Sequence, residues 1–142
     1  NLEISFSIIK IDELKEHEET DPKHLEKLIK KIKSDGFLKK PIAVDKNSGL
    51  VLDGAHRLKA VKMMGYSLIP AILLDYSSPK ILVKSWKKGK KITKEMVIKA
   101  GLTKNKLPPK TSKHMIKING KIKHISLLEK NVNFPLEKLK GD

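Results

Sequence analysis

The stretch Val51-Leu52-Asp53-Gly54-Ala55-His56-Arg57-Leu58-Lys59-Ala60 carries the most informative local pattern in this chain. Its pattern predicts that a strand ends at Asp53, that Gly54 makes a tight turn and that a helix begins at once. Such a junction aims free backbone N–H groups and the positive end of the helix at one place, where phosphate oxygens can bind. The junction therefore predicts a phosphate site, with a purely structural turn as the alternative.

Charged side chains crowd this junction. Arg57 is the only arginine among the 31 lysines and arginines of the chain. Its planar fork can grip a phosphate or a carboxylate through two parallel hydrogen bonds. His56, in the same first helical turn, can close on the same anion, and Asp53 can hold a magnesium ion that bridges phosphates. We therefore interpret Arg57 as a place where the geometry of the fork matters, and not its charge alone.

The spacing of apolar residues and of turn residues predicts the other elements. The predicted helices span residues 22–36, 55–64 and 93–100, with Asp21 and Thr93 as N-caps and with glycines (Gly36, Gly65 and Gly101) as stops. The predicted strands span residues 4–11, 41–45, 50–52, 69–75, 81–86, 115–118 and 121–125. The last two strands flank Asn119-Gly120, a strong hairpin signal.

The composition indicates a packed α/β or α+β domain. The chain has 142 residues, of which 39% are hydrophobic and 4% aromatic, so the core consists mostly of Ile, Leu and Val. The absence of cysteine excludes disulfides, thiolate metal sites and a cysteine nucleophile. The longest apolar run, residues 68–74, is far too short to span a membrane, and no signal-peptide pattern opens the chain. We therefore expect a cytoplasmic protein without a membrane partner.

The net charge of +15 raises the possibility of nucleic-acid binding. Arginine and aromatic residues, which read and stack bases, are nearly absent. An anionic small substrate would use the same positive field, and a lysine-rich chain without cysteine also fits a heat-adapted protein. Charge alone thus leaves both classes of partner open, with nucleic acid the less expected.

Three further segments combine polar groups. His17-Glu18-Glu19 precedes a capped helix, and the residues alone favour a solvated acidic loop there. The segment 108–114 brings hydroxyl and ammonium donors onto a stiff loop, which can hold an anion or be an ordinary polar loop. Trp86 is the only tryptophan, and it belongs either to the core or to a pocket wall. We interpret His24 and His124 as incidental, because no histidine shows metal-ligand spacing.

Several of these segments together resemble the ParB/sulfiredoxin-like superfamily and, within it, the archaeal and bacterial free-serine kinases. The resemblance covers nearly the whole chain. Residues 53–57 match a box shared across the superfamily, which speaks mainly to nucleotide binding. The box Pro109-Lys110-Thr111-Ser112-Lys113-His114 is far more specific to the serine kinases. The other matching segments are His17-Glu18, Lys40-Pro41, Asp75-Tyr76, Ser85-Trp86 and Thr93-Lys94-Glu95.

The resemblance implies a role for each of the matching residues. Glu18 is implied as the general base for a serine hydroxyl, Asp53 as the acidic residue that serves Mg²⁺, and Trp86 as a wall of the amino-acid pocket. The implied catalytic residues are Glu18, Asp53 and His56. The implied nucleotide- and phosphate-binding residues are Gly54, Ala55, His56, Arg57, Lys110, Thr111 and Ser112. The implied substrate-binding residues are Glu18, Trp86, Lys113 and His114.

The chain departs from the superfamily pattern in four ways. Ala55 stands where the serine kinases usually have a second histidine and where sulfiredoxins have their catalytic cysteine, so sulfiredoxin chemistry is excluded. Ser112 and Lys113 stand where threonine and arginine are common, and a lysine does not bind bidentately. Longer relatives insert a segment between the tryptophan and the third helix, so this chain resembles a compact version. Nothing here leaves room for the helix-turn-helix domain of ParB partition proteins.

We therefore predict one α+β domain over residues 1–142, with a small mixed sheet, flanking helices and a C-terminal hairpin. Residues 1–86 are the expected nucleotide-binding core, and residues 87–142 are expected to complete the substrate site. The predicted reaction is transfer of a phosphoryl group from ATP or ADP, with Mg²⁺, to the hydroxyl of free L-serine, which gives O-phospho-L-serine. The alternative is a ParB-like nucleic-acid-binding protein without kinase activity. The sequence does not fix the oligomeric state.

Overall fold

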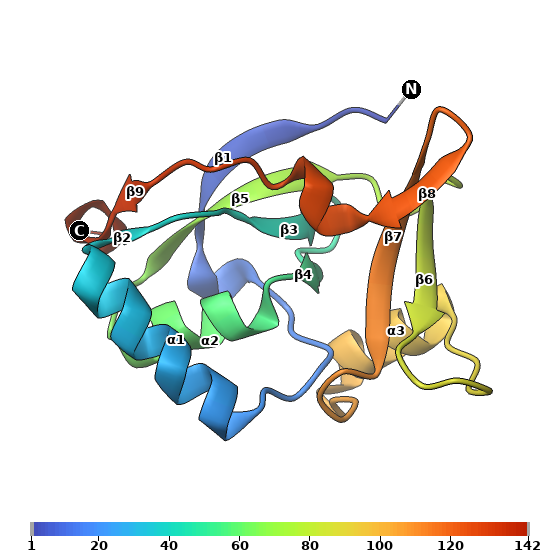
Figure 1. The fold of residues 1–142 in the computed structure, drawn as a ribbon, viewed down its shortest axis with the longest axis horizontal. Coiled ribbons are helices and arrows are strands. Elements are labelled where there is room, and N and C mark those ends of the chain that lie inside the picture. Colours follow the sequence, from blue (N-terminus) through green and yellow to red (C-terminus); the bar gives the residue numbers. More distant parts are fainter. Residues whose placement is uncertain (1, 142) are drawn as a thin grey trace.

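A four-stranded sheet forms the centre of the computed structural model, which describes residues 2–141 (Figure 1). Its strands are β1 (Ser5–Lys10), β5 (Leu68–Leu74), β3 (Ile42–Asp45) and β4 (Val51–Asp53), in that order across the sheet. The central pair, β3 and β5, is parallel, whereas β1 and β4 run antiparallel to their neighbours. The strands predicted at these positions are confirmed, and the sheet is mixed as expected.

Two helices cover one face of this sheet (Figure 1). In α1 (Pro22–Asp35), the side chain of Asp21 accepts a hydrogen bond from the backbone N–H of Lys23, and Gly36 ends the helix in the left-handed conformation. The helix α2 (Ala55–Met63) follows β4 directly. Leucine, isoleucine and valine side chains of both helices pack against β3 and β5 in one apolar cluster, which includes Leu25, Ile32, Leu58, Val61, Ile42, Val44 and Ile69.

A second, three-stranded antiparallel sheet stands beside the first (Figure 1). Its strands are β6 (Ile81–Ser85), β7 (Ser112–Ile118) and β8 (Lys121–His124), and α3 (Lys94–Thr103) lies next to it. A short ladder pairs β2 (Phe37–Leu38) with β9 (Phe134–Pro135). Three short 3₁₀ segments complete the fold: η1 (Ile11–Glu13), η2 (Ile125–Leu128) and η3 (Leu136–Leu139). The expected C-terminal hairpin, β7–β8, is confirmed.

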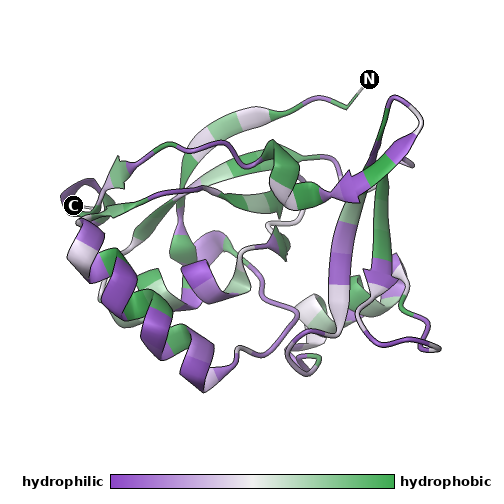
Figure 2. Ribbon diagram, in the orientation of Figure 1, coloured by the Kyte–Doolittle hydropathy of each residue, from purple (hydrophilic) through white to green (hydrophobic). Residues whose placement is uncertain are grey.

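The two inner strands of the central sheet, β3 and β5, are buried on both faces, which explains why they are mostly apolar (Figure 2). Alternate side chains of β3 enter different clusters. Ile42 and Val44 face the cluster beneath α1 and α2, whereas Ala43 faces a second cluster that contains Ile81, Ile116 and Val97 of the other sheet and of α3. The central sheet therefore packs against α1 and α2 on one face and against the second sheet and α3 on the other face.

Two predicted boundaries are wrong. The third helix does not stop at Gly101 but continues to Thr103, because Gly101 lies inside the helix at a close contact. A Cβ atom on Gly101 would lie 2.5 Å from Leu50 Cδ1, so the glycine serves packing and not termination. The strand β7 begins at Ser112 and not at Met115, so the second half of the 109–114 box is a strand and not a stiff loop. None of the helices in residues 2–141 combines the length and the apolar character that a membrane crossing needs.

Candidate functional site

A cavity of about 570 Å³ lies where the β4–α2 junction, the segment before α1 and the start of β7 meet. Three segments distant in sequence build its walls, together with Trp86 at the end of β6 and His124 at the end of β8. Its lining residues are His17, Glu18, Glu19, His24, Leu28, Val51, Leu52, Asp53, Gly54, Ala55, His56, Arg57, Trp86, Lys110, Ser112 and His124. Most of the residues that the sequence singled out therefore converge on one cavity.

The β4–α2 junction presents an open helix N-terminus to this cavity. Gly54 occupies the N-cap position in the left-handed conformation (φ 99°), and no side chain caps the first N–H groups of α2. A Cβ atom on Gly54 would lie 2.5 Å from Ile42 Cγ2, so a larger residue is excluded by packing as well as by conformation. Uncapped N–H groups with the positive end of the helix dipole form a site for an anion.

Arg57 lies at the edge of the same junction with three acceptors from the protein itself. One terminal nitrogen, Nη1, donates to the backbone carbonyl of Pro41. The other, Nη2, donates to Glu129 Oε1 at 2.8 Å and to Asp53 Oδ2 at 3.3 Å. The fork geometry that the sequence suggested is thus used, and the groups that it holds in this structure are a carbonyl and two carboxylates.

Glu129 follows η2 and is a residue that the sequence analysis missed. Its side chain is almost fully buried, and its Oε2 atom has no hydrogen-bond partner in residues 2–141. Burial raises the pKa of Glu129 to about 8; the nearby Asp53 carboxyl acts in the same direction, whereas Arg57 opposes the shift. No signal in the sequence marks it, because its role depends on the chain bringing it next to Arg57.

His56 connects the two helices at the cavity wall. Its Nε2 atom accepts a hydrogen bond from the backbone N–H of Asp21 at 2.9 Å, so Nδ1 is the nitrogen left to carry the ring hydrogen. His24 stacks on it, with 4.2 Å between the ring centroids. Burial lowers the pKa of His56; His24 and Lys110 act in the same direction, and Asp21 opposes them. The interpretation of His24 as incidental is therefore wrong, because its ring supports His56 and lines the cavity.

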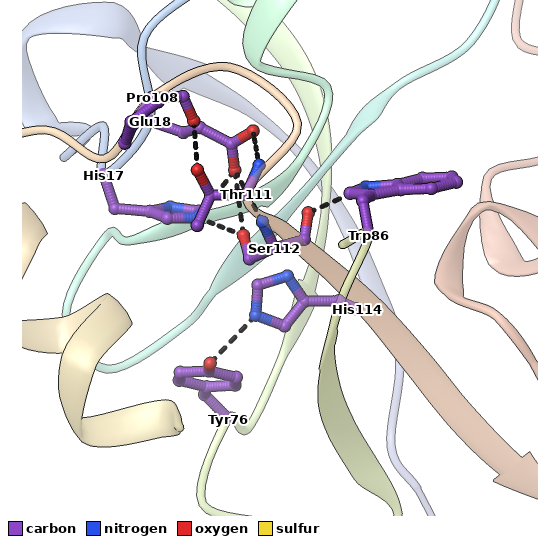
Figure 3. A network of polar contacts seen from close by, with 8 residues as sticks. All are labelled: His17, Glu18, Tyr76, Trp86, Pro108, Thr111, Ser112 and His114. Atoms are coloured by element: carbon purple, nitrogen blue, oxygen red, sulfur yellow. Dashed lines mark hydrogen bonds and ion pairs between the residues drawn. The ribbon is translucent and has the colours of Figure 1, made fainter. Parts of the chain in front are cut away.

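Glu18 also lines the cavity, and the start of β7 fixes its carboxylate (Figure 3). Glu18 Oε1 accepts from the backbone N–H of Thr111 at 3.1 Å, and Oε2 accepts from the hydroxyl of Ser112 at 2.9 Å and from its backbone N–H at 3.4 Å. Burial raises the pKa of Glu18, and these hydrogen bonds oppose the shift. The segment 17–19 is thus not a solvated loop but a structured wall of the cavity.

His17 completes this arrangement. Its Nε2 atom lies 3.0 Å from Ser112 Oγ and 3.6 Å from Glu18 Oε2 (Figure 3). The ring is buried, which lowers its pKa to about 4, so the ring stays uncharged at neutral pH; the backbone carbonyl of Val51 opposes the shift. The carboxylate of Glu18 therefore has an uncharged ring, and not a cation, as its neighbour.

Trp86 lies at the rim, half exposed, with its indole nitrogen donating to the carbonyl of Ser112 at 3.1 Å (Figure 3). Its ring faces the ammonium group of Lys113, 4.8 Å from the ring centroid, and lies 6.3 Å from the ring of His124. An exposed fraction of 53% argues against a core role for this tryptophan. The interpretation of His124 as incidental is also wrong, because its ring lines the cavity beside Trp86.

Three of the predicted site residues do not line the cavity. Thr111 turns its hydroxyl to the carbonyl of Pro108, although its backbone N–H holds Glu18. Lys113 lies over Trp86. His114 is buried, with its Nε2 atom 2.8 Å from the hydroxyl of Tyr76, and burial lowers its pKa to about 3. The other predicted residues of the site, from Glu18 to Ser112, line the cavity.

A divalent cation would find few protein ligands here. Within residues 2–141, no cluster of three or more His, Cys, Asp or Glu side chains is arranged to hold a metal ion. Asp53 is one carboxylate at the cavity wall, about one quarter exposed. Mg²⁺ is commonly held by one or two carboxylates together with phosphate oxygens and waters, so one carboxylate beside a phosphate site fits this ion.

A protein-family model, the ParB N-terminal domain, matches residues 2–85. The chain is 42% identical over 83 residues to an ATP-dependent L-serine kinase of Staphylothermus marinus, a match that covers 56% of this chain and 33% of that protein. It is 31% identical over 87 residues to the ADP-dependent L-serine kinase SerK of Thermococcus kodakarensis, with 58% and 36% covered. The matched part thus spans about a third of the length of these curated relatives.

Solved structures share the fold along nearly the whole chain. A free serine kinase in complex with AMP superposes with a TM-score of 0.80 at 18% identity, covering 94% of this chain and 93% of that one. SbnI of Staphylococcus aureus superposes with a TM-score of 0.69 at 15% identity, covering 96% and 90%. At such low identities the likeness concerns the fold, and it confirms the predicted α+β architecture with its C-terminal hairpin.

Proposed function

The chain belongs to the ParB N-terminal domain family, and on that premise we propose that it is a free L-serine kinase. It transfers a phosphoryl group from ATP or ADP to the serine hydroxyl and forms O-phospho-L-serine. The observation that carries the proposal is the presence, in one cavity, of an uncapped helix N-terminus and a fixed, partly buried carboxylate. The relatives named as ATP- and ADP-dependent L-serine kinases support it.

The β4–α2 wall is the donor side in this proposal. The N–H groups at the start of α2 bind phosphate oxygens of the nucleotide, and Gly54 and Ala55 allow the close approach. His56 offers its Nδ1 hydrogen, and Arg57 and Lys110 add positive charge at the rim. Asp53 would hold Mg²⁺, which supplies neutralisation of phosphate charge when bound.

The β7 wall is the acceptor side. Glu18 is the proposed general base, because its carboxylate faces the cavity and its pKa is raised, which brings a carboxylate closer to the range in which proton transfer is effective. Ser112 and the backbone N–H of Thr111 keep it in one orientation. Trp86 forms a wall for the amino acid, Lys113 faces its ring from β7, and His114 packs behind His17. Residues 87–142 thereby complete a site whose donor side comes mainly from residues 1–86.

The protein promotes this reaction mainly by aligning the two substrates and by neutralising negative charge. The serine oxygen forms a bond to phosphorus while the bond from phosphorus to the leaving nucleotide oxygen breaks. The hydroxyl proton passes to Glu18. An uncharged His17 beside this base favours the transfer, because a cation there would hold Glu18 in its deprotonated, weakly basic form.

Direct product detection tests the proposal. The protein is incubated with L-serine and Mg²⁺, with ATP and with ADP in parallel, and O-phospho-L-serine is sought by mass spectrometry. Formation of phosphoserine with either nucleotide is expected, and its absence with both would sink the proposal.

The net charge of +15 favours a second candidate, a nucleic-acid-binding protein of ParB type without kinase activity. Titration with duplex DNA across salt concentrations tests it. Affinity that is tight, steeply salt-dependent and indifferent to changes at Arg57 would support this candidate.

A further inference from the structure

Glu129 is buried at a position where a charged carboxylate would lower the stability of the fold. The residue is 2% exposed, follows η2 and does not line the cavity. One of its oxygens, Oε2, lacks a hydrogen-bond partner in residues 2–141, and an unpaired buried polar atom destabilises a fold. An apolar residue at position 129 would stabilise the core more, so the presence of a glutamate there indicates a functional role.

The explanation lies in the hydrogen bond between this side chain and Arg57. Glu129 Oε1 accepts from Arg57 Nη2 at 2.8 Å, a short charge-assisted hydrogen bond. Asp53 accepts from the same nitrogen at the longer distance of 3.3 Å, and the carbonyl of Pro41 accepts from Nη1. Acceptors on both terminal nitrogens fix the plane of a rigid guanidinium, which a single contact would leave free to rotate.

We propose that Glu129 is a positioning residue that holds the Arg57 fork against the cavity wall, ready for the phosphate groups of the bound nucleotide. It acts through Arg57 and touches neither the substrates nor the reacting atoms. The nature of the anion rests on the proposed function. Groups held in place before binding contribute more to affinity and rate than mobile ones.

This assignment also connects two parts of the chain. Arg57 belongs to the segment that matches the ParB family, residues 2–85, whereas Glu129 lies well beyond it. The C-terminal part therefore does more than supply the acceptor side, because it also completes the donor side. A purely structural role for Glu129 would instead change stability and leave the nucleotide constants alone.

Four variants of the full chain test the proposal: Glu129→Leu, Arg57→Lys, the double variant, and Glu137→Leu as a matched control on an exposed acid of η3. The measurements are the ADP dissociation constant by calorimetry, the KM values for nucleotide and serine, and the thermal midpoint. We expect Glu129→Leu, which removes the acceptor for Arg57, to weaken ADP binding and raise the nucleotide KM by about tenfold, with the serine KM changed less than about twofold. Glu137→Leu should leave all constants unchanged.

The double variant decides whether Glu129 acts through Arg57. If it does, the two single effects on ADP affinity do not multiply, and the coupling factor is at least about fivefold. Effects that multiply, or a folded Glu129→Leu variant with normal ADP affinity, overturn the proposal. Should Glu129→Leu fail to fold, Glu129→Asp keeps the carboxyl group on a shorter side chain and is judged by the same constants.

The two proposals fail in different ways. A chain that binds ADP but forms no phosphoserine sinks the kinase assignment, while the ADP measurements still decide the role of Glu129. Phosphoserine formation with a normal nucleotide KM in Glu129→Leu overturns the positioning role alone. A wild-type chain that binds no adenine nucleotide overturns both.

Discussion

The charged side chain of Arg57 stabilises the cavity wall that β4 and α2 form, whereas hydrogen bonds to the carboxylate of Glu18 stabilise the wall that β7 forms. On the first wall, the guanidinium of Arg57 holds the carboxyl groups of Asp53 and Glu129. On the second, Glu18 is surrounded by a hydroxyl, backbone N–H groups and the uncharged ring of His17. The difference suits two tasks: fixed charge binds a polyanion, and an uncharged surrounding leaves a carboxylate able to take up a proton.

The largest expected effect is that of Glu18→Gln. Phosphoserine formation should fall by about 10²–10⁴-fold, the usual contribution of a general base. ADP affinity, measured by calorimetry, should stay nearly unchanged because the donor wall is untouched. Glu19→Gln is the matched comparison, since Glu19 lines the same cavity without the contacts to β7. Loss of activity in Glu19→Gln but not in Glu18→Gln would move the base to Glu19.

The uncharged state of His17 predicts a pH effect on stability. The pKa of His17 is lowered to about 4, so between pH 6.5 and about 4 the unfolded chain binds a proton there that the folded chain does not. The free energy of unfolding should therefore decrease as the pH falls through this range, by up to about 3 kcal/mol from this group.

Urea unfolding of the wild type and of His17→Gln at pH 7.5 and pH 4.5 isolates that contribution. The wild type should lose more stability than the variant on acidification. Equal losses in wild type and His17→Gln would mean that folding does not lower the pKa of His17, and the contrast between the two walls would disappear.

Asp53→Asn tests the charged wall. The amide can still accept from Arg57, so the fold should be kept, but the charge that attracts Mg²⁺ is lost. The Mg²⁺ concentration for half-maximal activity should rise by at least about tenfold, as is common when groups at a metal site are changed. A Mg²⁺ titration of phosphoserine formation measures this, and an unchanged curve would reduce Asp53 to a residue of the turn.

The smallest expected effect is that of Trp86→Ala. We expect a rise of about three- to tenfold in the KM for serine, with a smaller change for the nucleotide, because Trp86 stands beside the acceptor wall. The thermal midpoint should change little, since 53% of the residue is exposed. A fall in the thermal midpoint alone would assign Trp86 to the core after all.

Local signals explain what could be predicted from the sequence. Asp21, Pro22 and Gly36 mark α1 because capping involves neighbours along the chain. The strand–glycine–helix junction at residues 53–57 is local for the same reason. The predicted end of the third helix at Gly101 was wrong because this glycine packs against Leu50, and tertiary packing makes that contact.

The remaining features required the fold. His24, His124 and Glu129 acquire their surroundings only when distant segments meet, and nothing near them in sequence indicates it. The start of β7 did carry an overlooked signal. Ser112, His114 and Ile116 alternate with lysine and methionine and are all buried, which is the pattern of a half-buried strand.

The contacts that define the cavity span long stretches of chain: 94 residues separate Glu18 from Ser112, and 72 separate Arg57 from Glu129. Closing loops of this length is a late and entropically demanding step of folding. The site should therefore be absent from partly folded chains and appear only when the last strands are in place. Nucleotide would then bind the fully folded chain selectively, and a cell rich in ATP or ADP would favour completion of folding by mass action.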